Sequence, residues 1–167
     1  MKSAKFGLAL SLVFVLVACT ESENSESIHW FSEADAETLR LTEEDIRRHA
    51  GQSKSFSVNG PIVEIIYPPL AEGEGLNQES RVVFRSPATF NVEFRENLAP
   101  IDFQTLEVRG RKFGMTRKYT DQVKPYLDGN KLLARNLELP KGKFLIEFDI
   151  EDTKGRKTIK GYFVESK

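Results

Sequence analysis

The densest charge in this chain is a group of five cations within one short stretch. We call this group the basic cluster; it consists of Arg109, Arg111, Lys112, Arg117 and Lys118. Concentrated positive charge can hold an anionic polymer or an acidic protein partner. Two other interpretations stay open: the cations keep a hairpin tip soluble, or they meet the acidic stretch between Glu21 and Asp45. Nucleic acid is not expected as a partner, because the formal net charge of the whole chain is −1.

Side chains that ligate transition metals are scarce. The chain has one cysteine and two histidines, and its possible soft ligands are Cys19, His29, His49 and Met115. Copper and zinc sites need several such ligands at close spacing, and both histidines precede the stretch that reads as the folded domain. We therefore expect no metal site and no cofactor.

Carboxylates offer the remaining chemistry. Glu147, Asp149 and Glu151 alternate along one predicted strand, and converging carboxylates could bind calcium or act as an acid–base pair. The simpler interpretation is that they form the solvated face of an amphipathic strand. The sequence also lacks a GxSxG nucleophile motif, and the predicted domain has no histidine to serve as a general base. We expect a protein without enzymatic activity.

The N-terminus has the proportions of an export signal. Lys2 and Lys5 precede an apolar run over residues 6–18, which is shorter than the roughly 20 residues that cross a bilayer. The residues Leu16, Val17, Ala18 and Cys19 then resemble the lipobox of bacterial lipoproteins. The resemblance implies that residues 1–18 are a signal peptide and that Cys19 carries acyl chains as the first residue of the mature protein.

Lipid on Cys19 implies a membrane anchor without a spanning helix, because several buried acyl chains attach a protein stably. Thr20 occupies the position where aspartate retains some lipoproteins at the inner membrane. The expected location is therefore the cell envelope at the outer membrane, on its periplasmic or its surface-exposed side. The alternative is an ordinary secretory signal that is removed by cleavage.

The segment after the cysteine changes composition twice. Residues 19–27 are polar and acidic, which is typical of a flexible tether. Residues 28–54 form a lead segment with one short helix, indicated by a capping-box pattern of Thr42 with Asp45. Leu39, Leu41 and Ile46 could supply its apolar face. This segment either docks on the domain or binds a partner; docking is the interpretation that we prefer, also for Trp30 and Phe31.

Residues 55–167 have the alternating pattern of half-buried strands. The predicted strands cover 61–67, 81–84, 88–96, 103–110, 130–139, 143–151 and 158–165. Turn residues separate them, which favours a β-sandwich. The placement of strands between Arg109 and Lys124 is left open.

Several of these segments are similar to bacterial immunoglobulin-like modules: PIVEIIYPP, ATFNVEF, APIDFQTLEV and LELPKGKFLIEFDIEDTKGRKTIKGYFVE. The resemblance implies an all-β, immunoglobulin-like or fibronectin type III-like sandwich of about seven strands, with the short N-terminal helix in front. It implies architecture and no particular activity. The expected function is a non-catalytic, membrane-anchored module that binds an envelope protein or supports an assembly. The alternative is a module that binds glycans or anionic envelope polymers through the basic cluster or through a surface formed by Tyr67, Tyr119 and Tyr126.

Overall fold

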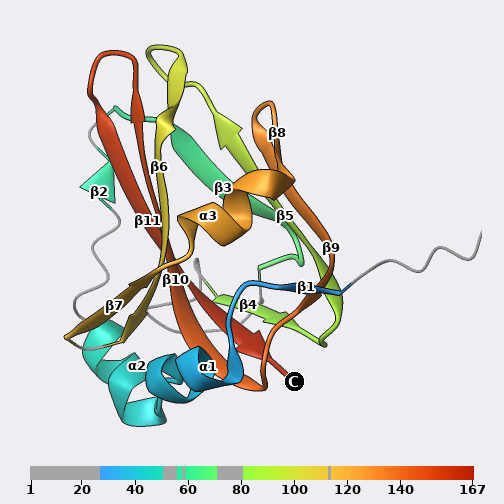
Figure 1. Cartoon of the computed structure of the whole chain (residues 1–167). Coiled ribbons are helices and arrows are strands. Elements are labelled where there is room, and N and C mark those ends of the chain that lie inside the picture. The colour runs from blue at the N-terminus through green and yellow to red at the C-terminus, as the bar shows by residue number, and fades with distance from the viewer. Residues whose placement is uncertain (1–26, 51–55, 58, 71–80, 113) are drawn as a thin grey trace, which may run out of the picture.

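The computed structural model describes residues 27–50, 56, 57, 59–70, 81–112 and 114–167. The predicted signal peptide, Cys19 and the tether up to residue 26 lie outside these ranges. The described chain forms two mixed β-sheets that pack face to face (Figure 1). The protein is therefore mostly β with a sandwich-like arrangement, as the alternating sequence pattern predicts.

The first sheet, sheet A, has the strand order β1-β9-β5-β3, with β8 paired to β9. Its strands are β1 (Ile28–His29), β3 (Ile62–Tyr67), β5 (Ala88–Arg95), β8 (Leu127–Asp128) and β9 (Lys131–Glu138). Strands β3, β5 and β9 are antiparallel neighbours, whereas β1 runs parallel to β9. The lead segment thus contributes a strand to the sandwich.

The second sheet, sheet B, has the order β2-β11-β10-β6-β7, with β4 paired in parallel to β11. Its strands are β2 (Phe56–Ser57), β4 (Arg81–Phe84), β6 (Ile101–Lys112), β7 (Met115–Lys118), β10 (Gly142–Asp152) and β11 (Lys157–Ser166). The seven predicted strands correspond to β3, β4, β5, β6, β9, β10 and β11. The four short strands β1, β2, β7 and β8 carry no alternation long enough to reveal them.

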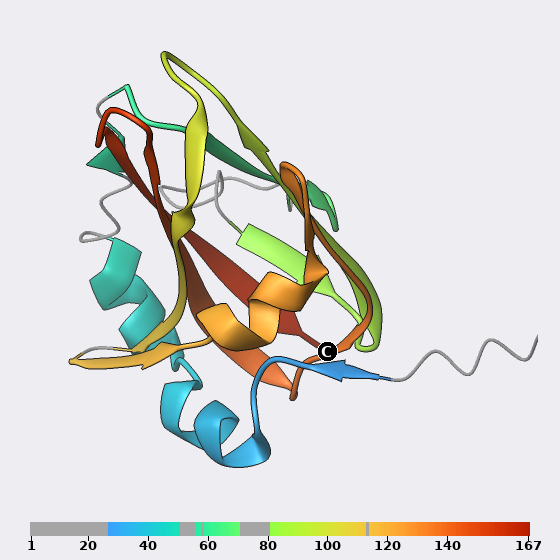
Figure 2. The same cartoon turned by 45° about the horizontal axis from the view of Figure 1, so that its top comes forward.

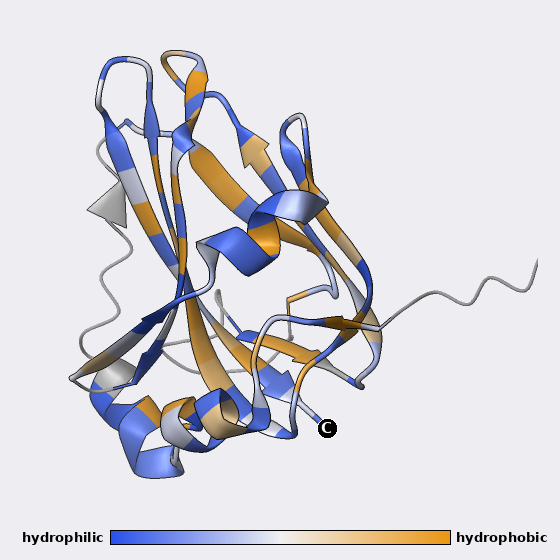
Figure 3. Ribbon diagram, in the orientation of Figure 1, coloured by the Kyte–Doolittle hydropathy of each residue, from blue (hydrophilic) through white to orange (hydrophobic). Residues whose placement is uncertain are grey.

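The core between the sheets follows the predicted period of two. Phe90, Val92 and Phe94 on β5 are fully buried, and they face Phe144 and Phe148 on β10 across the sandwich. Rings of the two sheets meet edge to face, for example Phe94 and Phe148, whose centroids lie 6.2 Å apart. Figure 3 shows the resulting changes of hydropathy along the long strands.

The turn between β10 and β11 is held by hydrogen bonds to Asp152. The Asp152 carboxylate accepts hydrogen bonds from the amides of Lys154 at 2.8 Å and Arg156 at 3.0 Å. Gly155 adopts a φ of 73°, a conformation that glycine takes without steric cost. The sequence left the strands between Arg109 and Lys124 unassigned. In the structure, this segment contains the end of β6, strand β7, helix α3 (Thr120–Val123) and the start of the 3₁₀ helix η2 (Lys124–Tyr126).

The predicted helix is α2 (Glu43–Ala50), and its capping box is present. The Thr42 amide donates to the Asp45 carboxylate at 2.9 Å, and the Asp45 amide donates to the Thr42 hydroxyl at 3.1 Å. A second helix, α1 (Glu33–Leu39), was not predicted, although Ser32 accepts from the Asp35 amide in the same way. The lead segment therefore contains two short helices, and the prediction of one was wrong.

The lead segment docks on the sandwich, which is the interpretation preferred from the sequence. Trp30 and Phe31 are each 3% exposed, and the Trp30 ring meets Phe90 at 5.3 Å. The two helices lie side by side at the end of the sandwich near β7 (Figure 2). The predicted single apolar face is wrong, however: Leu39 enters the main core, while Leu41 and Ile46 pack separately against the outer side of sheet B.

Candidate functional site

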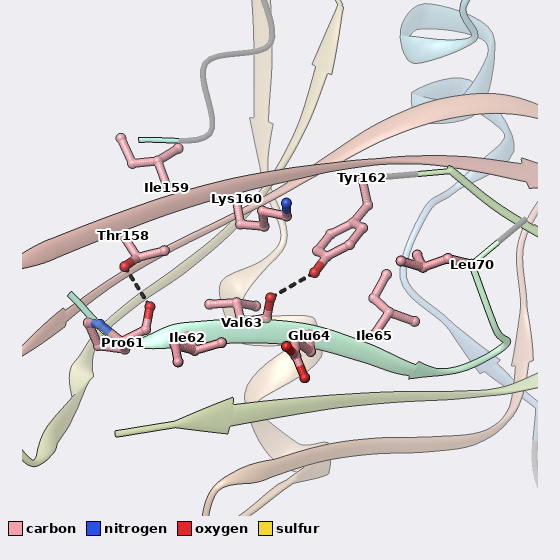
Figure 4. Close-up of a pocket in the computed structure, with 10 residues that line it drawn as sticks. All are labelled: Pro61, Ile62, Val63, Glu64, Ile65, Leu70, Thr158, Ile159, Lys160 and Tyr162. Atoms are coloured by element: carbon pink, nitrogen blue, oxygen red, sulfur yellow. Dashed lines mark hydrogen bonds between the residues drawn. The ribbon is translucent and has the colours of Figure 1, made fainter. Parts of the chain in front are cut away.

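The two sheets leave an open groove on the side where β3 meets β11. β3 is the last strand of sheet A, and β11 is covered on its outer side by β2 only at Thr158 and Ile159 and by β4 only from Phe163 onward. In the described ranges, residues 160–162 therefore have no strand partner on that side. A groove of about 500 Å³ opens there (Figure 4).

Apolar side chains from both sheets line this groove. The lining residues are Pro61, Ile62, Val63, Glu64, Ile65, Leu70, Thr158, Ile159, Lys160 and Tyr162. Directly after the lining residue Ile65 in the chain, Ile66 and Tyr67 are 47% and 50% exposed, and the lining residue Leu70 is 38% exposed. Exposed apolar residues are ordinary when scattered, but a group of them around a groove is typical of a binding surface.

Two side chains of β11 bridge the groove to the backbone of β3. The Thr158 hydroxyl donates to the Pro61 carbonyl at 2.6 Å, and the Tyr162 hydroxyl donates to the Val63 carbonyl at 2.7 Å (Figure 4). The Ile65 amide also hydrogen-bonds to the Tyr162 hydroxyl. These side chains therefore use hydrogen-bonding groups of the backbone that would otherwise be available to a neighbouring strand.

The Tyr162 ring is 2% exposed. Burial raises its pKa to about 12 because the phenolate loses hydration, and the hydrogen bond from the Ile65 amide offsets part of that effect. The hydroxyl thus stays protonated at any physiological pH and keeps its donor role toward β3.

Lys160 lies between Thr158 and Tyr162 on the same face of β11, because side chains at alternate positions of a strand share a face. Its ammonium sits 5.6 Å from the centre of the Tyr162 ring. Among the described residues that line the groove, Glu64 is the only one with a carboxylate, and it pairs with Arg95 at 2.7 Å. Within the described part of the chain, Lys160 makes no ion pair.

The basic cluster lies elsewhere, on β6 and β7, and it is largely paired. Arg109 contacts Glu147 at 3.1 Å and bonds to Asp149, and Arg111 contacts Glu147 at 2.7 Å. Lys118 contacts Glu107 at 2.6 Å. Hydrogen bonding from Lys118 lowers the pKa of Glu107, so the two charges stabilise each other.

The rest of the cluster lies near the acidic helices of the lead segment. Arg117 approaches Asp35 of α1 at 3.8 Å. Asp45 has a lowered pKa, chiefly because it accepts hydrogen bonds at Thr42, with a smaller contribution from the charge of Lys112. This placement agrees with the interpretation in which the cations meet the acidic stretch.

The predicted solvated face of β10 is wrong at two positions. Glu147 and Asp149 are 7% and 5% exposed, because cations of the neighbouring strands cover them. Lys157 of β11 reaches Asp149 at 3.0 Å and Glu151 at 3.8 Å. The carboxylates that could have formed an acid–base pair are thus held by ion pairs.

A second, polar cavity of about 370 Å³ lies over these charges. It includes Glu107, Asp149 and Glu151 together with Arg109, Lys118 and Lys157. Ion pairs from Arg109 on β6 and from Lys157 on β11 to Asp149 on β10 join these three strands.

The remaining predicted positions are dispersed. His29 is exposed and lies 3.6 Å from Glu138, Met115 is exposed on β7, and Cys19 is outside the described residues. Among the described residues, no three His, Cys, Asp or Glu side chains converge as metal ligands would. No helix in the described ranges has the length and apolar character needed to cross a membrane.

The groove was not predicted, because its two walls belong to segments far apart in the chain. The exposed apolar residues of PIVEIIY were the available signal, since a half-buried strand rarely carries so few polar residues. A comparison of the chain with protein-family models finds no match, and a comparison with curated proteins finds none either.

Proposed function

We propose that the protein is a bacterial envelope lipoprotein, anchored through lipid on Cys19, whose immunoglobulin-like domain binds another envelope protein without catalysis. Outer-membrane location is part of the proposal. The sequence features around Cys19 support the anchor, and the two-sheet architecture agrees with the immunoglobulin-like resemblance.

The groove between β3 and β11 carries the binding role. It combines an apolar lining, which includes the exposed Leu70, with the exposed Ile66 and Tyr67 that follow the lining residue Ile65 on β3. Large apolar side chains at such a surface are the residues that dominate the energetics of protein interfaces. The paired state of the basic cluster makes polymer binding the weaker alternative.

Photo-crosslinking in intact cells tests the binding role. A photoreactive residue at Ile66 should capture a defined envelope protein. The same residue at Leu98, which is 59% exposed on the turn between β5 and β6, is the matched control and should not capture it. Equal capture at both positions, or none at Ile66, would refute the groove as the binding surface.

The anchor is tested separately. Mass spectrometry of the membrane fraction should find the N-terminal peptide with acyl groups on Cys19, and Cys19→Ser should release the protein from the membrane. An N-terminal peptide without acyl mass would overturn the lipoprotein assignment and leave the groove experiment unaffected.

A further inference from the structure

The groove differs from a typical strand-addition site in its backbone chemistry. A peptide that adds to a sheet edge needs unpaired amides and carbonyls along that edge. The carbonyl of Pro61, which directly precedes β3, is already hydrogen-bonded to Thr158. On β3 itself, the Val63 carbonyl and the Ile65 amide are hydrogen-bonded to Tyr162. An added strand would have to break these bonds.

The opposite wall offers little more. In the described ranges, the outer edge of β11 lacks a strand partner only over residues 160–162, between the pairings with β2 and β4. Three residues span about 10 Å, which is short for a stable strand pairing. An extended peptide lying in the groove would therefore bury backbone groups without partners, which weakens its binding.

A ligand segment that satisfies its own backbone avoids this cost. An α-helix does so, because each interior amide bonds to a carbonyl four residues earlier. Its apolar side chains at positions i, i+3 or i+4, and i+7 can anchor in an apolar groove. The lining of Ile62, Ile65 and Leu70 supplies the complementary surface.

The charge in the groove indicates which charge the bound segment should carry. Lys160 faces the groove without an ion pair among the described residues, and Glu64 is already neutralised by Arg95. A carboxylate on the incoming segment would meet Lys160 in partly dehydrated surroundings, where a charge pair is stronger than at an open surface. An incoming cation would be repelled.

We propose that the groove between β3 and β11 binds an amphipathic α-helix of the partner protein, with an Asp or Glu on its apolar side paired to Lys160. This inference rests on the proposed function and deepens it by stating the chemistry of the partner. An extended peptide and a lipid are the competing occupants.

The experiment uses the full, membrane-anchored chain with the photoreactive residue at Ile66. The crosslinked site on the captured protein is mapped by mass spectrometry. It should lie in a segment with helical apolar spacing and an acidic residue. Lys160→Glu should reduce capture about tenfold or more, because it would set two negative charges against each other in the interface, and Lys160→Gln should reduce it less.

Lys131→Glu, a charge reversal at an exposed position of β9, is the matched control and should leave capture unchanged. Replacing the mapped acidic residue of the partner by lysine should restore capture by the Lys160→Glu variant. The Lys160 and Lys131 variants are first checked for a thermal unfolding temperature like that of the wild type. A loss of capture then reports on the interface and not on folding.

The outcomes separate the inference from the proposed function. Capture of an extended segment, or capture that is insensitive to Lys160→Glu, overturns the helix inference while the partner-binding role stands. Crosslinks to lipid only overturn both, as does the absence of any crosslink from Ile66.

Discussion

Replacing Tyr162 by phenylalanine tests whether side chains of β11 stand in for a missing strand beside β3. The substitution keeps the ring and removes only the hydroxyl. The Val63 carbonyl then loses its donor at 2.7 Å, and the Ile65 amide loses its acceptor. Val63 and Ile65 are 4% and 6% exposed, so neither group is freely hydrated.

A buried polar group left without a partner costs about 1–3 kcal/mol. The groove is open beside these two groups, so water can rehydrate them in part, and we expect a total loss of about 2 kcal/mol in the free energy of unfolding. For a domain of this size that corresponds to a fall in Tm of about 4–8 °C. Urea titration followed by circular dichroism measures the change, and the slope m should stay constant.

Tyr67→Phe is the matched control, because Tyr67 lies on β3 itself and is 50% exposed. Its effect should stay within about 0.5 kcal/mol, as for other surface substitutions. If Tyr162→Phe proves equally mild, the hydroxyl does not protect the edge, and the argument against strand addition at β3 fails with it.

Three further predictions concern the sheet, the helices and alkaline pH. Arg109→Met should lower the free energy of unfolding by about 2 kcal/mol in urea titration. This is less than the cost of removing one partner of a wholly buried ion pair, because other cations still contact Glu147 and Asp149. An unchanged urea midpoint would contradict the interpretation that these ion pairs are buried and stabilising. Thr42→Ala removes the capping box of α2 and should cost about 1 kcal/mol by the same measurement; no loss would mean that the cap is dispensable. Burial raises the pKa of Tyr119 and Tyr162 from 10.0 to about 12. The unfolded chain therefore loses these protons first, so stability should hold below pH 10 and fall between pH 10 and 12. Tyr119→Phe should flatten this fall in a pH series of thermal melts, and a fall as steep as that of the wild type would count against the assignment.

The long strands could be predicted because apolar and polar residues alternate along them, which marks the buried and the exposed face of each strand. On β5 the alternation of Phe90, Val92 and Phe94 with polar residues matches their complete burial. Short elements such as β7 escape this reasoning, since four exposed residues carry no hydrophobic pattern. Helix α1 could have been found from Ser32 and Asp35, which repeat the capping signal that revealed α2.

The charged pairs could not be predicted, because they depend on strand register. Glu147 lies opposite Arg109 when β10 pairs with β6, and this pairing lets the guanidinium cover carboxylates that look solvated in the sequence. The groove depends on the same kind of information. Its walls come from β3 and β11, and the closeness of Val63 and Tyr162 appears only once both sheets have formed.

The attachment of β1 has a mechanical consequence. β1 and β3 are the opposite edges of sheet A, and the Ser27 hydroxyl fastens the start of β1 to Glu138 of β9 at 2.7 Å. A pull between a lipid at the N-terminus and a partner in the groove would therefore run across sheet A, along the direction of the hydrogen bonds that join its strands. If the proposed lipid anchor is present, such tension would load the hydrogen bonds between β1, β9, β5 and β3 in series. The buried Trp30, which packs against Phe90, would then hold the β1 end of the sheet.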